Sequence, residues 1–399
     1  MQQTAKIVVV SQHYPPDHST TAAIMASIAS HLAPETPLLV LSGTPGSANQ
    51  QAINSGQPAV VEIRNRMGAK AALIRRASAE MFFTIRMFVA LLGRLRRGDV
   101  VLTVTAPFML PYAVAAAASL KRAPSVLIMH DLFPDVLVMA GLLKPSSFGP
   151  KLIRGANALM FRMLSAVVII GRDTEALLLR YKGLTRDRIC FIPNWATLAP
   201  GVRPINPDNP YRRAKIRFIV GLSGNLGFTH DPDIVFEAAR SLRDNPNIHF
   251  MLSGWGIGFD RLKAMQSAAK LPNVSLVERV PEQDLEAFLS AADVWLIPYR
   301  KDLAGVSVPS RFYNLLAIGR PVILVSEANA EAALTVTEHG IGWVVEPGKP
   351  DALAIAIRSA SLSVDSPMRE RAVTVSQRYD SARAMASYAE LMRKLLRQS

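Results

Sequence analysis

Cysteine is almost absent from this chain of 399 residues, in which Cys190 is the single example. One cysteine excludes an intramolecular disulfide and a metal cluster held by cysteines, and we expect Cys190 to be a small buried apolar residue. Half of the residues are apolar and about a fifth are charged, which indicates a globular chain. Its length suggests at least two domains.

Long apolar runs are absent as well. A membrane-spanning helix needs about 18–20 consecutive apolar residues. Leu110–Leu120 is too short, and Ala158–Ile170 contains Arg162. The first apolar run, Ile7–Val10, follows Lys6 and is bounded by polar residues, which indicates a strand rather than a signal peptide.

Acidic residues are scarce in the first half. Residues 1–200 hold 21 lysines and arginines against 10 aspartates and glutamates, a net charge of +11, whereas residues 201–399 hold 24 against 21. Residues 64–97 carry nine basic residues and a single acidic one, Glu80. This excess predicts an anionic partner for the first half.

The segment Arg75–Arg97 is apolar in its middle and basic at its ends. A basic amphipathic helix binds an anionic bilayer through apolar burial and through charge, at about 1 kcal/mol per basic residue near the surface. The alternative is a helix that packs its apolar face on a sheet and leaves its arginines in solvent. We favour an anionic membrane surface over nucleic acid, because the phenylalanines belong to the apolar face and are not stacking platforms.

Apolar strands alternate with helices along the chain. In the first half the predicted strands are Ile7–Val10, Leu38–Leu41, Val100–Val104, Val126–Met129, Val167–Ile170 and Ile189–Ile192, and the predicted helices are Thr21–Leu32 and Pro111–Leu120. After a proline-rich linker at residues 197–213, the strands are Phe218–Leu222, His249–Leu252, Val274–Val277, Val294–Ile297 and Val322–Val325, and the helices are Pro232–Leu242, Phe259–Ala269, Pro281–Ala291 and Ser381–Leu396. Continuous apolar strands are typical of parallel sheets buried on both faces, so we predict an α/β chain with two doubly wound domains facing across a cleft.

Residues 306–325 contain the most informative pattern. Pro309 and Ser310 predict the start of a short helix, and Gly319 predicts its end before a buried strand. A serine N-cap, free backbone N–H groups and the helix dipole favour an anion at this end. Arg311 lies in the first turn, against the dipole, which suggests that an anion lies nearby.

The segment Gly221–Pro232 follows a strand and opens a helix. Asp231 suits an N-cap and Pro232 suits the first helical position. Its glycines allow a phosphate to approach the backbone closely, although an ordinary glycine-containing turn is the alternative. The segment is neither a dinucleotide fingerprint nor a Walker motif.

His130 and Asp131 follow a buried strand, at the end of a parallel sheet where ligands bind. A structural histidine and a capping aspartate are the alternatives. Asp131 and Asp135 lack a third ligand, so we expect no metal there. The serines and threonines of the loop Gln12–Thr21 either cap the next helix or bind a ligand.

In combination, these motifs resemble the retaining glycosyltransferases of family 4, and most closely the subgroup that builds colanic acid, O-antigen and other bacterial exopolysaccharides. The matching segments follow the same order over nearly the whole chain: His130–Asp135, Ile192–Trp195, Ser223–Gly227, Leu252–Gly256, Ala292–Val294, Val308–Arg311 and Gly319–Val322.

The resemblance implies the GT-B fold, with two Rossmann-like domains. Residues 1–200 would bind the acceptor and residues 201–380 the nucleotide sugar, while residues 381–399 would cross back to the first domain. The implied reaction moves a sugar from a nucleotide diphosphate, expected to be UDP, to an undecaprenyl-diphosphate-linked saccharide with retention. No cofactor, no metal and no nucleic acid are expected, and the expected location is cytoplasmic, on the inner face of the plasma membrane.

The resemblance also implies a set of site residues. The predicted catalytic residues are His130, which would contact a sugar hydroxyl, Asp131 and Arg311. The predicted donor-binding residues are Gly224, Asn225, Gly227, His230, Gly254, Arg279, Val280, Ser310 and Asn314, and the predicted acceptor-binding residues are Ser19, Thr20 and Thr21. In a metal-free site, the Gly224–Gly227 backbone, Ser310 and Arg311 would stabilise the leaving diphosphate.

This sequence departs from the wider family at four positions. Val306 and Asn314 stand where many members carry a Glu-x7-Glu pair, and Asn225 and His230 stand where many carry an arginine and a lysine. Arg311 is therefore our candidate for the missing positive charge and Asn314 for a ribose contact. We interpret these changes as a property of the subgroup, with an inactive homologue as the alternative.

Other functions remain to be weighed. A nucleotide-sugar epimerase of the same fold would turn over the donor without an acceptor. A phosphorylase would need a lysine for pyridoxal phosphate, and we find no motif for one. A nucleic-acid-binding protein would show salt-sensitive binding to DNA, and the paired βα arrays disfavour it.

Overall fold

The structure, a computed structural model, describes residues 5–17, 19–44, 56–64, 73–212 and 216–398, without the side chains of Thr44 and residues 73–77. The chain divides into two compact units. Unit 1 comprises Met1–Asp135, Lys144–Pro193 and Ala382–Ser399, and unit 2 comprises Val136–Leu143 and Asn194–Ser381.

Unit 1 is built on a seven-stranded parallel sheet in the order β3-β2-β1-β4-β5-β6-β7. Its strands are β1 (Ile7–His13), β2 (Leu38–Thr44), β3 (Ala59–Glu62), β4 (Val100–Val104), β5 (Ser125–Met129), β6 (Ala166–Ile169) and β7 (Ile189–Phe191). In the central register Val9 pairs with Val40 on one side and with Leu102 on the other. Every residue of β4 and β5 is buried, as expected for a parallel sheet covered on both faces.

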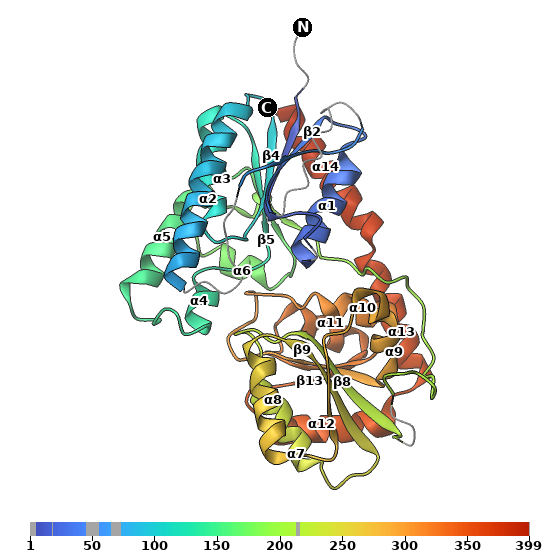
Figure 1. Ribbon diagram of the computed structural model, residues 1–399. Helices are drawn as coiled ribbons and strands as arrows, with labels where there is room; N and C mark the ends of the chain where they lie inside the picture. Colours follow the sequence, from blue (N-terminus) through green and yellow to red (C-terminus); the bar gives the residue numbers. More distant parts are fainter. Residues whose placement is uncertain (1–4, 18, 45–55, 65–72, 213–215, 399) are drawn as a thin grey trace. The chain divides into compact units, whose positions relative to one another are not determined.

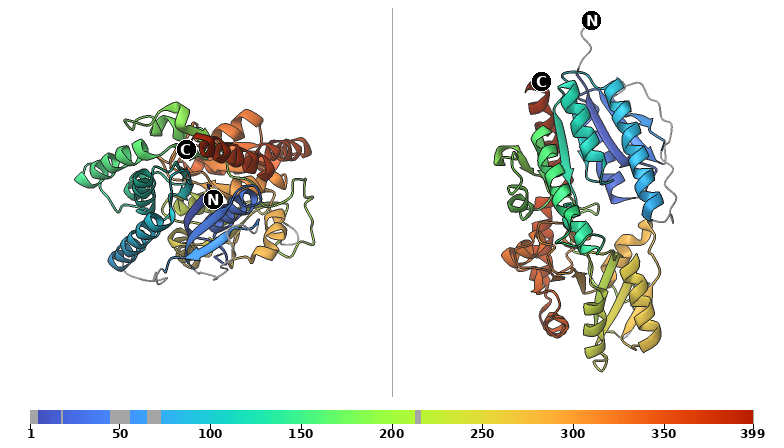
Figure 2. Two further views of the ribbon diagram at one scale, coloured as in Figure 1. Left: turned by 90° about the horizontal axis from the view of Figure 1, so that it is seen from above. Right: turned by 90° about the vertical axis from the view of Figure 1, so that its left-hand side faces the viewer.

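Helices cover both faces of this sheet (Figure 1). One face carries α2 (Leu73–Arg94), α3 (Leu110–Lys121) and α5 (Phe148–Met163), and the other carries α1 (Thr20–Leu32) and α14 (Ser381–Gln398). The short helix α6 (Thr174–Leu178) and a 3-10 turn at Arg186–Arg188 complete the set in unit 1. The short helix α4 (Asp135–Met139) belongs to unit 2 except for its first residue. Figure 2 shows α3 between α2 and α5, and it contacts both.

The core under α2 and α3 follows from the alternation of strand side chains. Val8 and Val10 point to one face of β1 and pack with Phe83 and Leu91 of α2 and Val114 of α3. Each such fully buried apolar side chain contributes about 1.5–3 kcal/mol. This packing of α2 and α3 on the sheet fixes the position of the carboxyl ends of the strands.

Unit 2 has a six-stranded parallel sheet in the order β10-β9-β8-β11-β12-β13. Its strands are β8 (Phe218–Asn225), β9 (Ile248–Trp255), β10 (Val274–Val277), β11 (Val294–Pro298), β12 (Val322–Val325) and β13 (Gly342–Val345). Its helices are α7 (Pro232–Ser241), α8 (Ile257–Ala269), α9 (Leu285–Ala291), α10 (Arg311–Ala317), α11 (Glu331–His339), α12 (Pro350–Ser363) and α13 (Ser366–Ser376), with 3-10 turns at Glu282–Asp284 and Gln377–Tyr379. The helices α7, α8 and α12 share one core with the sheet, and α10 and α11 contact α13.

Most predicted elements are confirmed, with small shifts at their ends. The strands β4, β10 and β12 have the predicted bounds, whereas Pro281–Ala291, predicted as one helix, begins with a 3-10 turn and becomes α9. The sequence prediction missed β3, β13, α4, α5, α6 and α11–α13. Among the described residues, no helix is both long and apolar enough to cross a membrane.

The proline-rich segment predicted as a linker is held on unit 2. The Gly201 N–H donates to the Ala317 carbonyl at 2.8 Å, and the Arg203 N–H donates to the Ile318 carbonyl at 3.1 Å. These bonds satisfy carbonyls at the end of α10, which otherwise lack partners within the helix. The first part of the segment is therefore an ordered cap on α10.

Candidate functional site

The glycine-rich turn joins β8 to α7 at the carboxyl edge of the sheet in unit 2. Asp231 is the N-cap of α7, where its side chain accepts from the Asp233 and Ile234 N–H groups, and Pro232 occupies the first turn, both as predicted. The Leu226 N–H donates to the Trp255 carbonyl at 2.9 Å, and the Asp231 N–H donates to the Pro298 carbonyl at 2.8 Å. The turn is thus fixed to the ends of β9 and β11.

The glycines of this region serve two purposes. A Cβ on Gly254 would lie 2.4 Å from the Gly224 carbonyl oxygen, so packing of β8 against β9 requires glycine there. Gly224 has a φ of +122°, which also favours glycine. Gly227 has neither a positive φ nor a close neighbour, since a Cβ there would meet only the Asn225 side chain at 3.9 Å. Its small size leaves the turn open to a ligand.

Arg311 reaches this turn from α10. Its guanidinium lies beside Gly224, where an added Cβ would be 3.7 Å from Nη2. Arg311 is partly buried, and burial lowers the pKa of its guanidinium. Among the described residues it has no hydrogen-bond or ion-pair partner. A partly buried cation without a partner is costly unless an anion joins it, so Arg311 is suited to a phosphate at the glycine-rich turn.

Ser310 occupies the N-cap position of α10, but its hydroxyl does not cap the helix. Its backbone is helical, with φ −61° and ψ −30°, and its side chain makes no capping hydrogen bond. The helix has only seven residues. The helix terminus therefore offers less to an anion than we predicted, and Arg311 offers more.

His230 lies at the end of the glycine-rich turn. Its ring packs on Tyr299 with centroids 5.0 Å apart, and its Nδ1 lies 3.0 Å from the Thr229 hydroxyl. Burial, with a smaller effect of Arg300, lowers the pKa of His230 to about 4. A neutral imidazole can donate a hydrogen bond to a phosphate but supplies no charge, so His230 does not replace the missing lysine as a cation.

Arg279 lies over the indole of Trp255, with its guanidinium carbon 4.5 Å from the ring centroid. Both side chains are exposed, and Val280, which follows Arg279, is partly exposed. Trp255 pairs with Asn225 across β8 and β9, so this stacked pair adjoins the glycine-rich turn. It offers a flat surface beside that turn.

The side chain of Asn314 forms hydrogen bonds with another segment of the same chain. Its Oδ1 accepts from the Thr197 N–H at 2.7 Å and from the Leu198 N–H at 3.2 Å, and its Nδ2 donates to the Thr197 hydroxyl at 3.0 Å. These bonds attach the segment before unit 2's first strand to α10. A ribose contact would require Asn314 to give them up, so we assign it a structural role.

Arg320, the arginine of the Gly-Arg-Pro-Val motif, also proves to be structural. It is completely buried, and it donates to the carbonyls of Arg203 at 2.6 Å and Ser290 at 2.8 Å. Burial, together with neighbouring Arg369, lowers its pKa to about 9. Only one of the two arginines in residues 306–325 is therefore available to a ligand.

Glu327, at the carboxyl end of β12, was not predicted from the sequence. Its Oε1 accepts the Asp302 N–H and so holds the loop after Tyr299, while its buried Oε2 has no hydrogen-bond partner in the described part of the chain. An acidic side chain two residues after the predicted strand Val322–Val325 was the available signal. Glu327 is a carboxylate on this sheet edge, where the Glu-x7-Glu pair is missing.

In unit 1, His130 and Asp131 directly follow β5, as predicted. The Thr105 hydroxyl accepts from the N–H groups of both, at 3.2 and 3.3 Å, and fixes their backbone. Burial lowers the pKa of His130 to about 4, and its buried Nε2 has no hydrogen-bond partner among the described residues. Such a neutral, unpartnered ring nitrogen is suited to a substrate hydroxyl.

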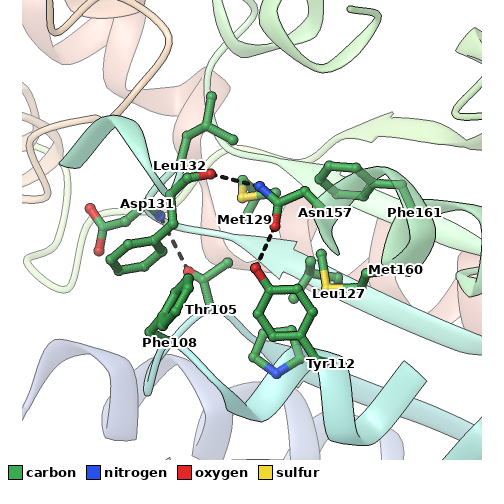
Figure 3. A pocket seen from close by; sticks show the side chains of 12 residues that line it. Thr105, Phe108, Tyr112, Leu127, Met129, Asp131, Leu132, Asn157, Met160 and Phe161 are labelled. Carbon is green, nitrogen blue, oxygen red and sulfur yellow. Dashed lines mark hydrogen bonds between the residues drawn. The ribbon is translucent and has the colours of Figure 1, made fainter. Parts of the chain in front are cut away.

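A small cavity lies beneath this loop and is drawn in Figure 3. It is too small for a substrate, and the residues that line it support the loop. Its volume is about 20 Å³, room for roughly one water molecule. Asn157 donates to the Phe133 carbonyl at 2.7 Å and accepts from the Tyr112 hydroxyl at 2.6 Å. This network joins α3 and α5 to the loop that carries His130.

The predicted acceptor residues lie at the start of α1. Ser19 is its N-cap and accepts the Ala22 N–H at 3.2 Å, which is the capping alternative, while Thr20 is exposed and Thr21 partly exposed. In the same loop, His13 Nδ1 and Asp17 Oδ2 lie 2.6 Å apart.

Asp17 also accepts the Ser19 N–H. Burial alone would raise the pKa of Asp17, but its hydrogen bonds to His13 and Ser19 lower it below its ordinary value. The structure thus places two groups of predicted residues on two sheet edges: His130, Asp131 and the Ser19 loop in unit 1, and the glycine-rich turn with Arg311 in unit 2.

The basic segment Arg75–Arg97 largely coincides with α2, but the side chains of Arg75 and Arg76 lie outside the described residues. One side of α2 packs on the sheet through Phe83, Met87 and Leu91. The other exposes Met81, Phe82, Ile85 and Val89. Cys190 in β7 is half-buried rather than fully buried, and burial raises the pKa of its thiol.

Known proteins resemble both units. Residues 208–376 match the model of the glycosyl transferases group 1, and residues 38–195 match that of a glycosyl transferase 4-like domain. The probable glycosyltransferase WbjE of Pseudomonas aeruginosa is 29% identical over 331 residues, which cover 82% of each chain. The putative colanic acid biosynthesis glycosyl transferase WcaI of Escherichia coli (strain K12) is 28% identical over 289 residues, 70% of each chain.

Solved structures share the fold at low sequence identity. Anabaena Alr3699/HepE in complex with UDP has a TM-score of 0.65 and 16% identity, covering 99% of this chain and 100% of the other. Sucrose-phosphate synthase from Thermosynechococcus elongatus has a TM-score of 0.68, with the same identity and coverage. The two parallel-sheet units and these matches together identify the chain as a glycosyltransferase with the GT-B fold.

Proposed function

We propose that this glycosyltransferase moves a sugar from a nucleoside diphosphate, UDP, to a lipid-linked saccharide during the synthesis of a bacterial surface polysaccharide. The reaction breaks the bond between the anomeric carbon and the diphosphate and forms a bond from that carbon to the oxygen of an acceptor hydroxyl, with retention. The proton of the hydroxyl passes to the departing diphosphate. Negative charge develops on the departing diphosphate, and a preorganised cation there lowers the barrier. The observation that carries the proposal is the partly buried guanidinium of Arg311, which lies beside Gly224 and has no partner among the residues that the structure describes.

The other roles follow from the chemistry of each group. Gly227 leaves the turn open to the diphosphate, and neutral His230 would donate a hydrogen bond to it. The unpartnered Nε2 of His130 would contact a hydroxyl of the transferred sugar. Glu327 would meet a hydroxyl of the donor with its free oxygen. No metal or cofactor enters the proposal.

The relatives support the substrate classes proposed here. WcaI is described as a colanic acid biosynthesis enzyme, and HepE has been solved with UDP and with UDP and glucose. These proteins are described as transferases or as bound to a donor product, so they lend no support to an epimerase. A lipid-linked acceptor agrees with the exposed apolar side chains of α2 and with the basic excess of the first half of the chain.

Transfer of radiolabelled sugar from a panel of nucleotide sugars tests the proposal. We expect Arg311→Ala to lower turnover by about 10²–10³-fold, the usual effect of removing one group that stabilises transition-state charge. We expect His130→Ala to lower it at least about tenfold. Exposed Arg358 and His31 provide matched controls, since alanine at either position should leave turnover unchanged. Near-normal turnover in both site variants would refute the assignment, and an inactive wild type with every donor would refute the function.

A further inference from the structure

A cationic groove lies beside α5 in unit 1, apart from His130 and the Ser19 loop. Its volume is about 620 Å³, and it is lined by Leu132, Asp135, Arg154, Gly155, Ala158, Arg162, Leu177, Arg180, Tyr181 and Lys182. Four of these residues are basic and one is acidic. The groove thus combines positive charge with apolar walls.

Among the described residues, three of the four cations of the groove have no side-chain partner. Arg154 pairs with Asp135 at 3.0 Å, which neutralises the only acid of the groove. In the part of the chain that the structure describes, the side chains of Arg162, Arg180 and Lys182 form neither ion pairs nor hydrogen bonds. Three cations around one groove favour a ligand with more than one negative charge.

Two glycines shape the groove. A Cβ on Gly183 would lie 2.4 Å from the Arg162 side chain, and Gly183 has a φ of +95°, so glycine lets Arg162 lie across this loop. Gly155 is in the middle of α5, where glycine is unfavourable, yet a Cβ there would meet nothing within 4 Å. Packing gives no reason for Gly155, and its absent side chain keeps the groove open.

An apolar stripe runs beside the groove on the same helix. Arg154, Ala158 and Arg162 recur every four residues and form the groove side of α5. Phe148, Leu152 and Leu159 are 75%, 61% and 59% exposed, and their positions around the helix place them directly next to that line. A ligand with an acidic head and a long apolar chain would satisfy both surfaces.

We infer that this groove binds the diphosphate of the lipid-linked acceptor, with the lipid chain lying along Phe148, Leu152 and Leu159. This inference rests on the proposed function for the nature of the acceptor. The groove shares Leu132 with the loop that carries His130 and Asp131, so a saccharide attached to the diphosphate would extend toward those residues. The groove would hold the acceptor by its diphosphate and lipid chain. The saccharide of the acceptor would then remain free to receive the transferred sugar.

Isothermal titration calorimetry with farnesyl diphosphate tests this inference. We expect wild-type binding that weakens about tenfold or more in Arg162→Gln/Lys182→Gln and that weakens as salt rises. Gly155→Leu should also block the groove, and it keeps the helix because leucine is a better helix former than glycine. The control Arg358→Gln/Arg383→Gln removes two exposed arginines elsewhere and should bind as the wild type does.

Three results of the titration would overturn the inference: no binding of farnesyl diphosphate, equal binding by the groove variants and wild type, or equal affinity for inorganic pyrophosphate and farnesyl diphosphate. Stronger groove-dependent binding to phosphatidylglycerol vesicles than to neutral vesicles containing farnesyl diphosphate would also overturn it, because a membrane phospholipid would then be the ligand. UDP binding serves as an independent readout. If UDP binds but farnesyl diphosphate does not, the inference fails while the proposed donor site stands.

Discussion

Arg311 and Arg320 are nine residues apart, but their surroundings give them opposite roles. Arg311 has no partner in the described part of the chain, whereas Arg320 donates to two main-chain carbonyls in the core of unit 2. We expect Arg320→Met to reduce the free energy of unfolding by roughly 2–4 kcal/mol, because the carbonyls of Arg203 and Ser290 lose their donor. Thermal unfolding should show this loss, while UDP affinity of the folded variant changes by less than about twofold. Lost UDP binding with an unchanged melting temperature would instead place Arg320 in the donor site.

His130 and His230 make stability depend on pH. Burial lowers both pKa values to about 4, below the ordinary value of 6.5. The unfolded chain therefore binds protons first as the pH falls, so each histidine contributes stability that is present above pH 6.5 and is lost toward pH 4. The expected slope is about 1.4 kcal/mol per pH unit for each residue.

Urea denaturation at a series of pH values between 7 and 4 measures this effect. His130→Gln and His230→Gln should each flatten the fall of the denaturation midpoint. His31→Gln, at an exposed position, should leave the fall unchanged. A midpoint that falls equally in all three variants and the wild type would contradict the burial argument.

Single residues also show what the sequence could not reveal. Strand-end placement correctly indicated the positions of His130 and the glycine-rich turn. The role of Asn314 depends on Thr197, which is 117 residues away in the chain, so no local pattern signals it. Glu327 likewise acts on Asp302, 25 residues away. Contacts at such separation arise only when the sheet is assembled.

Two glycines at the glycine-rich turn of unit 2, Gly254 and Gly227, should respond differently to substitution. Gly254→Ala should destabilise unit 2, because its Cβ would lie 2.4 Å from the Gly224 carbonyl and push β8 from β9. Gly227→Ala meets no such obstacle and should leave the melting temperature nearly unchanged while it weakens UDP binding several-fold. Thermal unfolding and calorimetry of the two variants separate these effects. Unaltered UDP affinity in Gly227→Ala would mean that the turn does not bind the diphosphate.

Secondary structure was predictable where one face of an element is apolar and its ends are marked. The strand β12 follows Pro321, and α7 has Asp231 and Pro232 at its start, so their bounds could be read closely. By contrast, α5 exposes Phe148, Leu152 and Leu159. These exposed apolar residues lie outside the buried face of α5, so the sequence lacks the regular spacing of apolar residues that predicts a helix. The exposed apolar side chains that prevented the prediction of α5 are the same ones that form the proposed lipid site.

At the scale of the whole molecule, exposed apolar side chains and basic charge in unit 1 predict binding to anionic membranes. We expect the protein to sediment with vesicles that contain anionic lipid, and less so at high salt. Phe82→Ser/Val89→Ser should reduce sedimentation, because both side chains are more than 60% exposed on α2. Ile355→Ser/Leu362→Ser removes similarly exposed side chains from α12 in unit 2 and should have no effect. Sedimentation that is independent of lipid charge, or equally reduced by both pairs, would refute membrane docking by α2.

The two parallel sheets were predictable as a whole because nearly every strand is a continuous apolar run. Their order was not, since β3 is a short edge strand with an exposed end. The residues around the glycine-rich turn of unit 2 were predictable as a set, but the pattern of contacts among them was not. That pattern depends on which arginine forms hydrogen bonds within the folded chain, as Arg320 does.

Calorimetric titration with UDP shows whether Arg311 is the cation that holds the donor diphosphate. Arg311→Met keeps the apolar stem and removes the charge, and Arg311→Lys keeps the charge and removes the planar fork. We predict that the methionine variant binds UDP roughly 10- to 100-fold more weakly than the wild type, with the lysine variant in between. An affinity for UDP that is the same in all three proteins would contradict the account.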